Sequence, residues 1–123
     1  MRTMSALPIL KKFMNDPIRG TIANKGKVRG RARIVNSSKD FKKFVEGDIL
    51  IADLTSPAYS PVIMKAAAIV TNKGGITSHP AIIAREFNIP CIVGTKNATK
   101  LIKNDDLIEV DANKGIITII KII

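Results

Sequence analysis

The residues best suited to chemistry stand together in the middle of the chain, around its single histidine. His79 follows Gly74, Gly75, Thr77 and Ser78 in the stretch TNKGGITSHPAIIAREFNIP. Two glycines allow the backbone to turn sharply and leave access to the neighbouring side chains, and two hydroxyl groups come next. Because a neutral imidazole can act as a nucleophile, this spacing predicts a reactive histidine beside a glycine loop.

The expected position of His79 is the first turn of a helix. Ser78 suits the N-cap, Pro80 is tolerated in the first turn, and Asn88 followed by Pro90 is typical of a helix end. Free backbone N–H groups and the helix dipole favour negative charge at this end, so a phosphoryl group on His79 would be stabilised. The residues alone leave a second interpretation open, in which His79 is a packed or solvated surface histidine.

The elements around this stretch indicate a mixed domain in which strands outnumber helices. We expect strands within residues 20–35, around a turn at 24–26, and at 48–52, 66–71, 89–93, 107–111 and 116–121. We expect short helices near Phe41, Phe44 and Val45, at 60–65 with Ser60 as N-cap, at 78–88 and at 98–102. This order predicts a β-rich α/β domain with short helices.

Composition favours one domain in a reducing compartment. The chain has 123 residues, of which 46% are hydrophobic and 24% charged, enough for a single core. One cysteine, Cys91, excludes an internal disulfide framework, and its apolar surroundings predict a buried small side chain. The apolar runs are too short to span a membrane, so we expect a soluble, cytoplasmic protein.

The net charge of +10 suits an anionic partner. Arg29, Arg31 and Arg33 alternate along an expected strand, as in a solvated face or in a surface that docks an acidic protein or nucleic acid. Aromatic residues make up 4% of the chain and tryptophan is absent, so nucleic acid is the less favoured partner. Strand alternation and a turn explain the acidic residues of the last hairpin without a metal ion; these are Asp105, Asp106, Glu109 and Asp111.

Residues 71–95 resemble the signature of the mobile, or swivelling, phosphohistidine domain of phosphoenolpyruvate-utilising enzymes, G-G-x-T-S-H-A-A-x-x-A-R-E-x-x-I-P-x-V-V-G. The family includes phosphoenolpyruvate synthase, pyruvate phosphate dikinase and enzyme I of the sugar phosphotransferase system. The matching residues are Gly74, Gly75, Thr77, Ser78, His79, Ala81, Ala84, Arg85, Glu86, Ile89, Pro90, Val93 and Gly94. The resemblance extends to an opening hairpin at 20–35 and a closing hairpin near the end. It implies a swivelling β/β/α domain over residues 20–123, preceded by an extension or linker remnant at 1–19.

The resemblance implies that His79 is phosphorylated and relays the group, with Thr77 and Ser78 beside it and Gly74 and Gly75 in the phosphate-binding loop. The donor would be phosphoenolpyruvate or an ATP-grasp nucleotide-binding domain, and the acceptor would lie on a TIM-barrel domain that binds phosphoenolpyruvate or pyruvate. ATP and Mg²⁺ are expected on those partners, with no cofactor or metal on this chain, which lacks a Walker A loop. Arg85 is a further candidate docking residue, beside Arg29, Arg31 and Arg33.

Two other interpretations remain beside the carrier of a phosphoenolpyruvate synthase-like system. One is a non-catalytic interaction module of the same fold, binding nucleic acid or a protein through its basic face. The other is that the chain is one domain of a larger synthase. Thr77 matches a position that is regulated by phosphorylation in the plant dikinase, and it also suits a plain turn or cap hydroxyl.

The chain departs from the family pattern at three positions. Pro80 stands where alanine is usual and removes one N–H near the histidine. Asn88 and Asp105 stand where glycine is usual, and both residue types tolerate the left-handed backbone conformation that glycine adopts. We expect these exchanges to affect folding more than chemistry.

Overall fold

One long strand, β3 (Lys27–Ile34), is shared by two sheets in the computed structural model, which describes residues 16–121. Its first part pairs antiparallel with β7 (Leu107–Asp111), and its last part pairs parallel with β4 (Ile49–Ala52). The other strands are β1 (Ile18–Arg19), β2 (Thr21–Asn24), β5 (Ala68–Thr71), β6 (Cys91–Val93) and β8 (Ile116–Lys121). Within the described residues the strand order is β1-β8-β7-β3-β4-β5-β6-β2.

The two ends of this strand order are neighbours in the chain. β1 pairs with β8 and β2 pairs with β6, yet only Gly20 separates β1 from β2. The sheet therefore folds back on itself into two layers, an antiparallel one (β1, β8, β7, β3) and a largely parallel one (β3, β4, β5, β6, with β2 at its edge).

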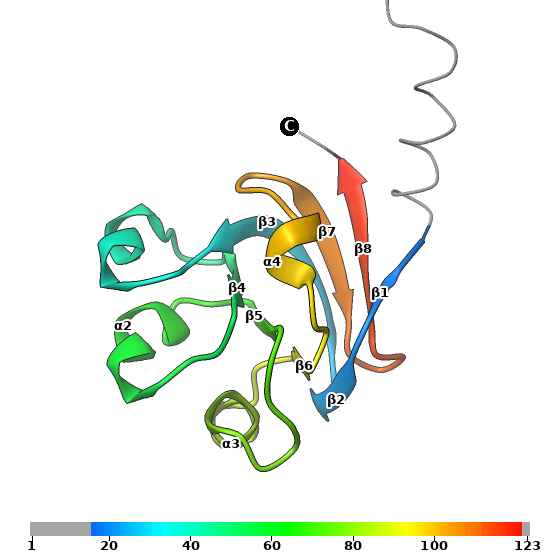
Figure 1. The fold of residues 1–123 in the computed structure, drawn as a ribbon, viewed down its shortest axis with the longest axis horizontal. Coiled ribbons are helices and arrows are strands. Elements are labelled where there is room, and N and C mark those ends of the chain that lie inside the picture. Colours follow the sequence, from blue (N-terminus) through cyan, green and yellow to red (C-terminus); the bar gives the residue numbers. More distant parts are fainter. Residues whose placement is uncertain (1–15, 122–123) are drawn as a thin grey trace, which may run out of the picture.

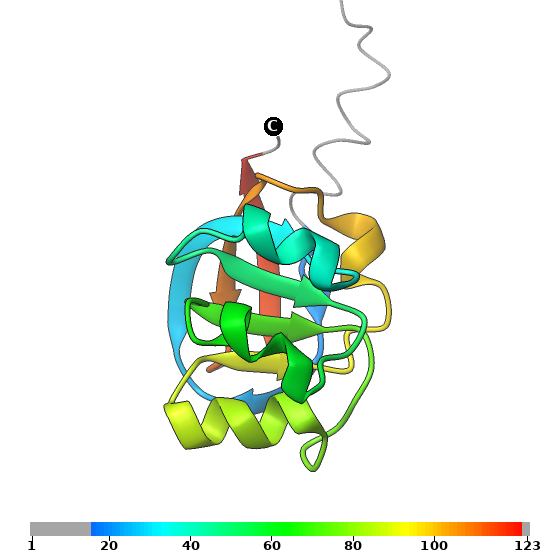
Figure 2. The ribbon, with the colours of Figure 1, turned by 90° about the vertical axis from the view of Figure 1, so that its left-hand side faces the viewer.

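Short helices cover the outer side of the parallel layer (Figure 1, Figure 2). They are η1 (Ser38–Lys43), η2 (Pro57–Tyr59), α2 (Ser60–Ile63) and α3 (His79–Phe87), while α4 (Ala98–Leu101) packs against β4 and β5. No helix within residues 16–121 is long and apolar enough to cross a bilayer.

Two apolar clusters hold the layers together. The first lies between the sheets and includes Ile49, Ile51 and Ile108, while the second lies between the parallel layer and the helices and includes Leu50 and Ile69. Every residue of β4 and β5 is buried, because both faces of these strands are covered. Packing on both faces therefore fixes the position of the carboxyl ends of β4 and β5.

The structure confirms the β-rich α/β fold class and the closing hairpin of β7 and β8. It contradicts the opening hairpin, because β2 and β3 do not pair with each other. After the turn, the Gly26 carbonyl accepts a hydrogen bond from Ala112 N–H, which draws the chain onto β7. The residues at 24–26 determine the turn, whereas strands distant in the chain provide the pairing partners of β2 and β3.

Several boundaries differ from the sequence-based expectation, and three of them have a clear physical reason. The helix at residue 60 has Tyr59 as its N-cap, and the Ser60 hydroxyl donates instead to the Pro57 carbonyl. The 3₁₀ helix η1 ends before Val45, which is exposed. The sheet begins at Ile18, two residues before the expected domain start, because β1 pairs with β8. Residues 1–15 of the expected extension lie outside the described residues.

Candidate functional site

The candidate site lies where the parallel strands end. Thr55 follows β4, the glycine loop follows β5, and Thr95 follows β6, so these segments meet at one edge of the sheet. This edge is where open α/β sheets usually bind ligands. His79 begins α3 directly after the glycine loop, which brings the histidine to the same edge.

A short hydrogen bond fixes the imidazole. His79 Nδ1 lies 2.8 Å from the hydroxyl oxygen of Thr55, a residue that is 5% exposed. His79 itself is half-buried. When Nδ1–H donates to the Thr55 hydroxyl, the lone pair of the ring is on Nε2. In that tautomer Nδ1 is anchored to Thr55, and Nε2 is the nitrogen with a free lone pair.

Thr55 is not among the site residues expected from the sequence. It lies in the stretch DLTSP, directly after the buried strand β4. Its position directly after a strand could have indicated a site residue, because polar residues at the carboxyl ends of neighbouring parallel strands meet at one edge of the sheet. Recognising that signal required knowing that β4 and β5 are neighbours, which the sequence does not state.

Ser78 occupies the expected N-cap position of α3, but its side chain does not cap the helix. Its hydroxyl and its backbone N–H both donate to the Gly75 carbonyl, at 2.7 and 3.1 Å. Ser78 therefore closes the glycine loop and leaves the first-turn N–H groups of α3 to another acceptor. Thr77, next to it, is exposed.

Gly74 is required by its backbone and by its neighbour. Its φ is +102°, and a Cβ at this position would lie 2.7 Å from Ser78 Oγ. A side chain here would strain the backbone and displace Ser78. Gly75 has open space around it, so only the first of the two predicted glycines is sterically required.

A buried amide ties three segments of the edge together. The Asn72 side chain donates to Asp53 Oδ1 at 3.0 Å and to Thr99 Oγ1 at 2.8 Å, and accepts from Thr99 N–H at 3.1 Å. The loop after β4, the end of β5 and the start of α4 are thereby connected. The hydrogen bond from Asn72, followed by that from Lys73, lowers the pKa of the Asp53 carboxyl.

Arg85, one of the candidate docking residues, contacts the glycine loop. Its guanidinium reaches back from α3 and donates to the Ile76 carbonyl at 2.7 Å. The side chain therefore braces the glycine loop from α3.

The three arginines of β3, Arg29, Arg31 and Arg33, differ in exposure. Arg29 and Arg31 are exposed on β3 in the antiparallel layer, and Arg29 pairs with Glu109 at 2.9 Å. Arg33 is 12% exposed and pairs with Asp48 at 3.4 Å and Asp105 at 2.7 Å. Only two of the three arginines are therefore exposed together. The third, Arg33, connects the segment of Asp48 to that of Asp105.

The remaining sequence-based expectations concern local structure. Cys91 is buried, as predicted, and this burial raises the pKa of its thiol to about 12. Asn88 and Asp105 have φ of 55° and 73°, the left-handed conformation expected where the family has glycine. Pro80 is buried in the first turn of α3. Residues 16–121 contain no group of three or more His, Cys, Asp or Glu side chains placed to hold a metal ion.

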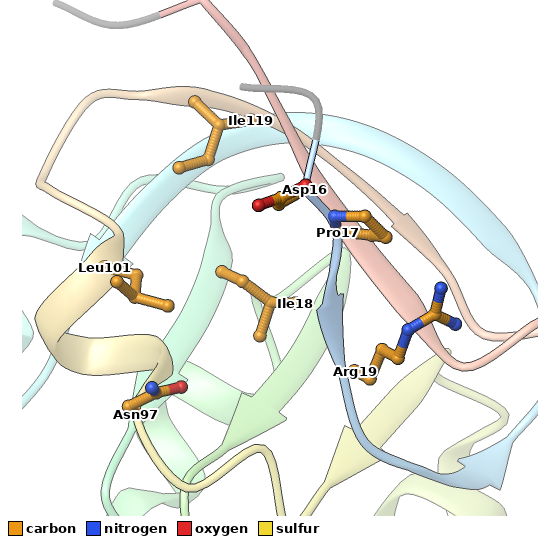
Figure 3. Close-up of a pocket in the computed structure, with 7 residues that line it drawn as sticks. All are labelled: Asp16, Pro17, Ile18, Arg19, Asn97, Leu101 and Ile119. Atoms are coloured by element: carbon orange, nitrogen blue, oxygen red, sulfur yellow. The ribbon is translucent and has the colours of Figure 1, made fainter. Parts of the chain in front are cut away.

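A pocket of about 330 Å³ lies at a different place, between β1, α4 and β8 (Figure 3). Ile18 and Leu101 point toward each other across it, while the guanidinium of Arg19 points away. Its lining includes neither His79 nor Thr55. The candidate site is therefore an exposed edge and not this pocket.

Comparison with known proteins identifies relatives of this arrangement. The chain is 43% identical over 100 residues to a probable phosphoenolpyruvate synthase of Archaeoglobus fulgidus, which covers 81% of this chain and 13% of the relative. It is 52% identical over 86 residues to phosphoenolpyruvate synthase of Aquifex aeolicus, which covers 70% of this chain and 10% of the relative. The chain thus spans about a tenth of the length of these relatives.

Solved structures show the same fold. A solution NMR structure of Enzyme I matches with a TM-score of 0.56 and 33% identity, over 65% of this chain and 33% of the other. A crystal structure of aconitase X from Thermococcus kodakaraensis matches with a TM-score of 0.64 over 87% of this chain and 100% of the other, and at 18% identity it supports the fold alone.

The family model described as "PEP-utilising enzyme, mobile domain" matches residues 44–115, which include the glycine loop, His79 and Thr55. Because that match spans more than half of the sequence, the chain belongs to the family of mobile domains of phosphoenolpyruvate-utilising enzymes.

Proposed function

We propose that this chain is a phosphohistidine carrier, in which His79 takes a phosphoryl group from a donor site and passes it to an acceptor site on other domains. The observation that carries the proposal is the 2.8 Å contact between His79 Nδ1 and the Thr55 hydroxyl, because it anchors one nitrogen and leaves the other for transfer. The names of the relatives support a phosphoenolpyruvate synthase-like system.

The transfer balances without a further reagent. The Nε2 lone pair attacks phosphorus, the bond between phosphorus and the donor's leaving oxygen breaks, and its electron pair stays on that oxygen. The Nδ1 proton remains in place, donated to the Thr55 hydroxyl. In the second step an acceptor oxygen attacks phosphorus, the N–P bond breaks, and the electron pair returns to Nε2.

The surroundings of His79 suit a bound phosphoryl group. His79 is the first residue of α3, where the helix dipole and free N–H groups favour an anion. Because the Ser78 hydroxyl is engaged by the Gly75 carbonyl, it does not compete for those N–H groups. Pro80 removes one of them, and the others remain for the phosphoryl oxygens.

Turnover would require partner domains. The proposed partners are an ATP-grasp nucleotide-binding domain and a TIM-barrel domain, on which ATP and Mg²⁺ would bind. The matched segments make up 13% and 10% of these two relatives, which leaves room for such domains. With ATP, Mg²⁺ and pyruvate alone, we therefore expect the isolated chain to form no phosphoenolpyruvate.

The test uses a small phosphoryl donor and the fact that the chain has one histidine. Potassium phosphoramidate should transfer one phosphoryl group per chain, stable in base and labile in acid. Phosphorus NMR should place it on Nε2, and His79→Ala should remain unlabelled. Label that persists in His79→Ala, or a wild-type chain that stays unlabelled while free histidine reacts, would contradict the proposal.

A further inference from the structure

The hydrogen bond between Thr55 and His79 depends on the position of the loop after β4. Thr55 is the third residue after that strand, and its hydroxyl lies 2.8 Å from Nδ1 of the ring. A shift of this loop by about 1 Å would break the bond, because hydrogen bonds of this kind rarely exceed about 3.2 Å. The contacts that hold the start of the loop therefore determine whether Thr55 can hold the ring.

Asp53, two residues before Thr55, is fixed to the end of β5 through its three oxygens. Its carbonyl accepts from Lys73 N–H at 2.9 Å, Oδ1 accepts from the Asn72 amide at 3.0 Å, and Oδ2 pairs with the Lys73 ammonium at 3.1 Å. The Lys73 side chain is 70% exposed, whereas Asn72 is 8% exposed, so water competes more strongly with the ion pair. The amide of Asn72 is therefore the main side-chain contact that holds Asp53.

Asn72 is itself fixed by the elements on either side of it. The same amide nitrogen donates to the Thr99 hydroxyl at 2.8 Å, and the amide oxygen accepts from Thr99 N–H at 3.1 Å. In the backbone, Asn72 N–H donates to the Ala52 carbonyl at 3.0 Å, and the Asn72 carbonyl accepts from Lys96 N–H at 2.9 Å. With both N–H groups and the oxygen engaged, the amide has one favourable orientation.

The side chain at position 72 has to donate as well as accept. Asp53 offers a carboxylate oxygen, while Thr99 offers both an acceptor and a donor, from the start of α4, which packs on β4 and β5 (Figure 1). An aspartate of the same shape could only accept, and it would place a second negative charge beside Asp53. The geometry therefore requires an amide at this position.

Resting on the function proposed above, we propose that Asn72 is a positioning residue for phosphoryl transfer. It holds Asp53, and thereby keeps Thr55 at the position from which the hydroxyl orients the ring. Asn72 acts through these two residues and not on the phosphoryl group. Loss of its amide should therefore change the orientation of the His79 ring before it changes the fold.

Three variants remove or rebuild the hydrogen bond between positions 72 and 53. Asn72→Asp keeps the side-chain shape but places a carboxylate 3.0 Å from that of Asp53, so the two repel each other. Asn72→Asp combined with Asp53→Asn, the swapped variant, restores a donor and an acceptor in reversed order at the net charge of the wild type. Asp53→Ala removes the same hydrogen bond from its exposed side and replaces Asn72→Asp in the comparison should that variant not fold.

Asp48→Asn is the matched control. Asp48 is 5% exposed, pairs with Arg33 at 3.4 Å and accepts from Val45 N–H at 3.0 Å, so this variant also weakens a buried contact next to β4. Asp48 precedes β4, whereas Thr55 follows it, so the control lies at the opposite edge of the parallel layer. Its melting temperature should fall without a change at His79.

The readouts report on the ring and not on stability alone. Nitrogen-15 NMR shows which ring nitrogen carries the proton, and an untagged chain has a single histidine, so its ring signals need no assignment. Phosphoramidate labelling followed by phosphorus NMR gives the rate and the ratio of Nε2 to Nδ1 phosphohistidine. All variants are measured well below the melting temperature of the least stable one.

We expect Asn72→Asp and Asp53→Ala to lose the wild-type distribution of the ring proton and to be labelled at Nε2 about fivefold more slowly. The swapped variant should recover most of both properties, and Asp48→Asn should keep both.

Wild-type ring signals and rates in folded Asn72→Asp or Asp53→Ala would overturn the inference. So would an equal loss in Asp48→Asn, or a folded swapped variant that recovers neither property. A wild-type chain that phosphoramidate does not label would instead refute the proposed carrier function, and the ring signals would then decide by themselves whether Asn72 positions Thr55.

Discussion

At the scale of single residues, one hydroxyl contacts the ring of the only histidine. Thr55 contacts Nδ1 of His79, whereas the Thr77 side chain is exposed and the Ser78 hydroxyl donates to the Gly75 carbonyl. The sequence motif around His79 therefore does not contain every residue that contacts its ring.

Replacing Thr55 by valine tests this role. Thr55→Val keeps the side-chain shape but removes the partner of Nδ1, at a cost of about 1 kcal/mol in stability. We expect the chain to remain folded, and Nε2 phosphorylation by phosphoramidate to fall roughly tenfold as the ring loses its fixed orientation. Phosphorus NMR would also detect a share of the Nδ1 isomer.

Thr118→Val, on β8 far from the site, is the matched control and should label like the wild type. Identical rates and isomer ratios in Thr55→Val and the wild type would show that the hydrogen bond does not orient the imidazole.

Cys91 predicts a pH dependence of stability. Burial raises the pKa of the folded thiol from 9.0 to about 12, so the unfolded chain loses this proton at lower pH than the folded chain. The stability contribution is complete below pH 9 and is lost as pH rises toward about 12.

Denaturant unfolding from pH 8 to 11 should therefore show a steeper loss of stability in the wild type than in Cys91→Ala. Parallel curves for the two proteins would contradict the prediction. In the native state at pH 8 the thiol should also resist alkylation, since a buried protonated thiol is a poor nucleophile.

At the scale of elements, the glycine loop and α3 act as one unit. Gly74 allows the turn, Ser78 closes it through the Gly75 carbonyl, and Arg85 holds it from the helix. The loop thus sets where α3 begins, and thereby where His79 stands relative to Thr55.

The two glycines provide a matched pair of variants. Gly74→Ala places a Cβ 2.7 Å from Ser78 Oγ at a φ of +102°, and should destabilise the chain by about 1–3 kcal/mol and slow phosphorylation of His79. Gly75→Ala meets no neighbour and should change the melting temperature little. Equal melting temperatures for the two variants would refute the steric explanation.

At the scale of the whole molecule, the exposed arginines of β3 and the candidate site lie on different layers. The exposed arginines of β3 lie on the antiparallel layer, whereas His79 lies at the edge of the parallel layer (Figure 1). With a net charge of +10, the molecule as a whole attracts anionic partners, so these arginines affect the rate of encounter more than the contact itself.

Arg29→Ala combined with Arg31→Ala should therefore slow labelling of His79 by a protein donor at low salt and weaken the salt dependence of that rate. The donor is full-length Aquifex aeolicus phosphoenolpyruvate synthase supplied with labelled phosphoenolpyruvate. The melting temperature should hardly change, since exposed ion pairs contribute about 0–1 kcal/mol. Arg33→Ala is the contrasting variant, expected to lose roughly 3 kcal/mol because it leaves Asp48 buried without its cation.

If the labelling rates do not change with ionic strength, Arg29 and Arg31 form a plain solvated face without a role in docking. Binding of DNA with a steep salt dependence would favour the nucleic-acid interpretation of the basic surface.

The sequence alone identified the local features. The glycine loop, the start of α3 at His79, its left-handed end at Asn88 and the closing hairpin all follow from residue types that restrict their own backbone. Burial of Cys91 followed from its apolar neighbours. The resemblance of residues 71–95 to a known signature added the family.

Tertiary structure alone decided the features that depend on distant partners. Thr55 and His79 are 24 positions apart, and they meet only because β4 and β5 lie side by side. The partners of β2 and the separation of Arg33 from the exposed arginines were settled in the same way. The residues of a strand indicate which of its faces is apolar, whereas the packing of the whole sheet determines which strands lie next to it.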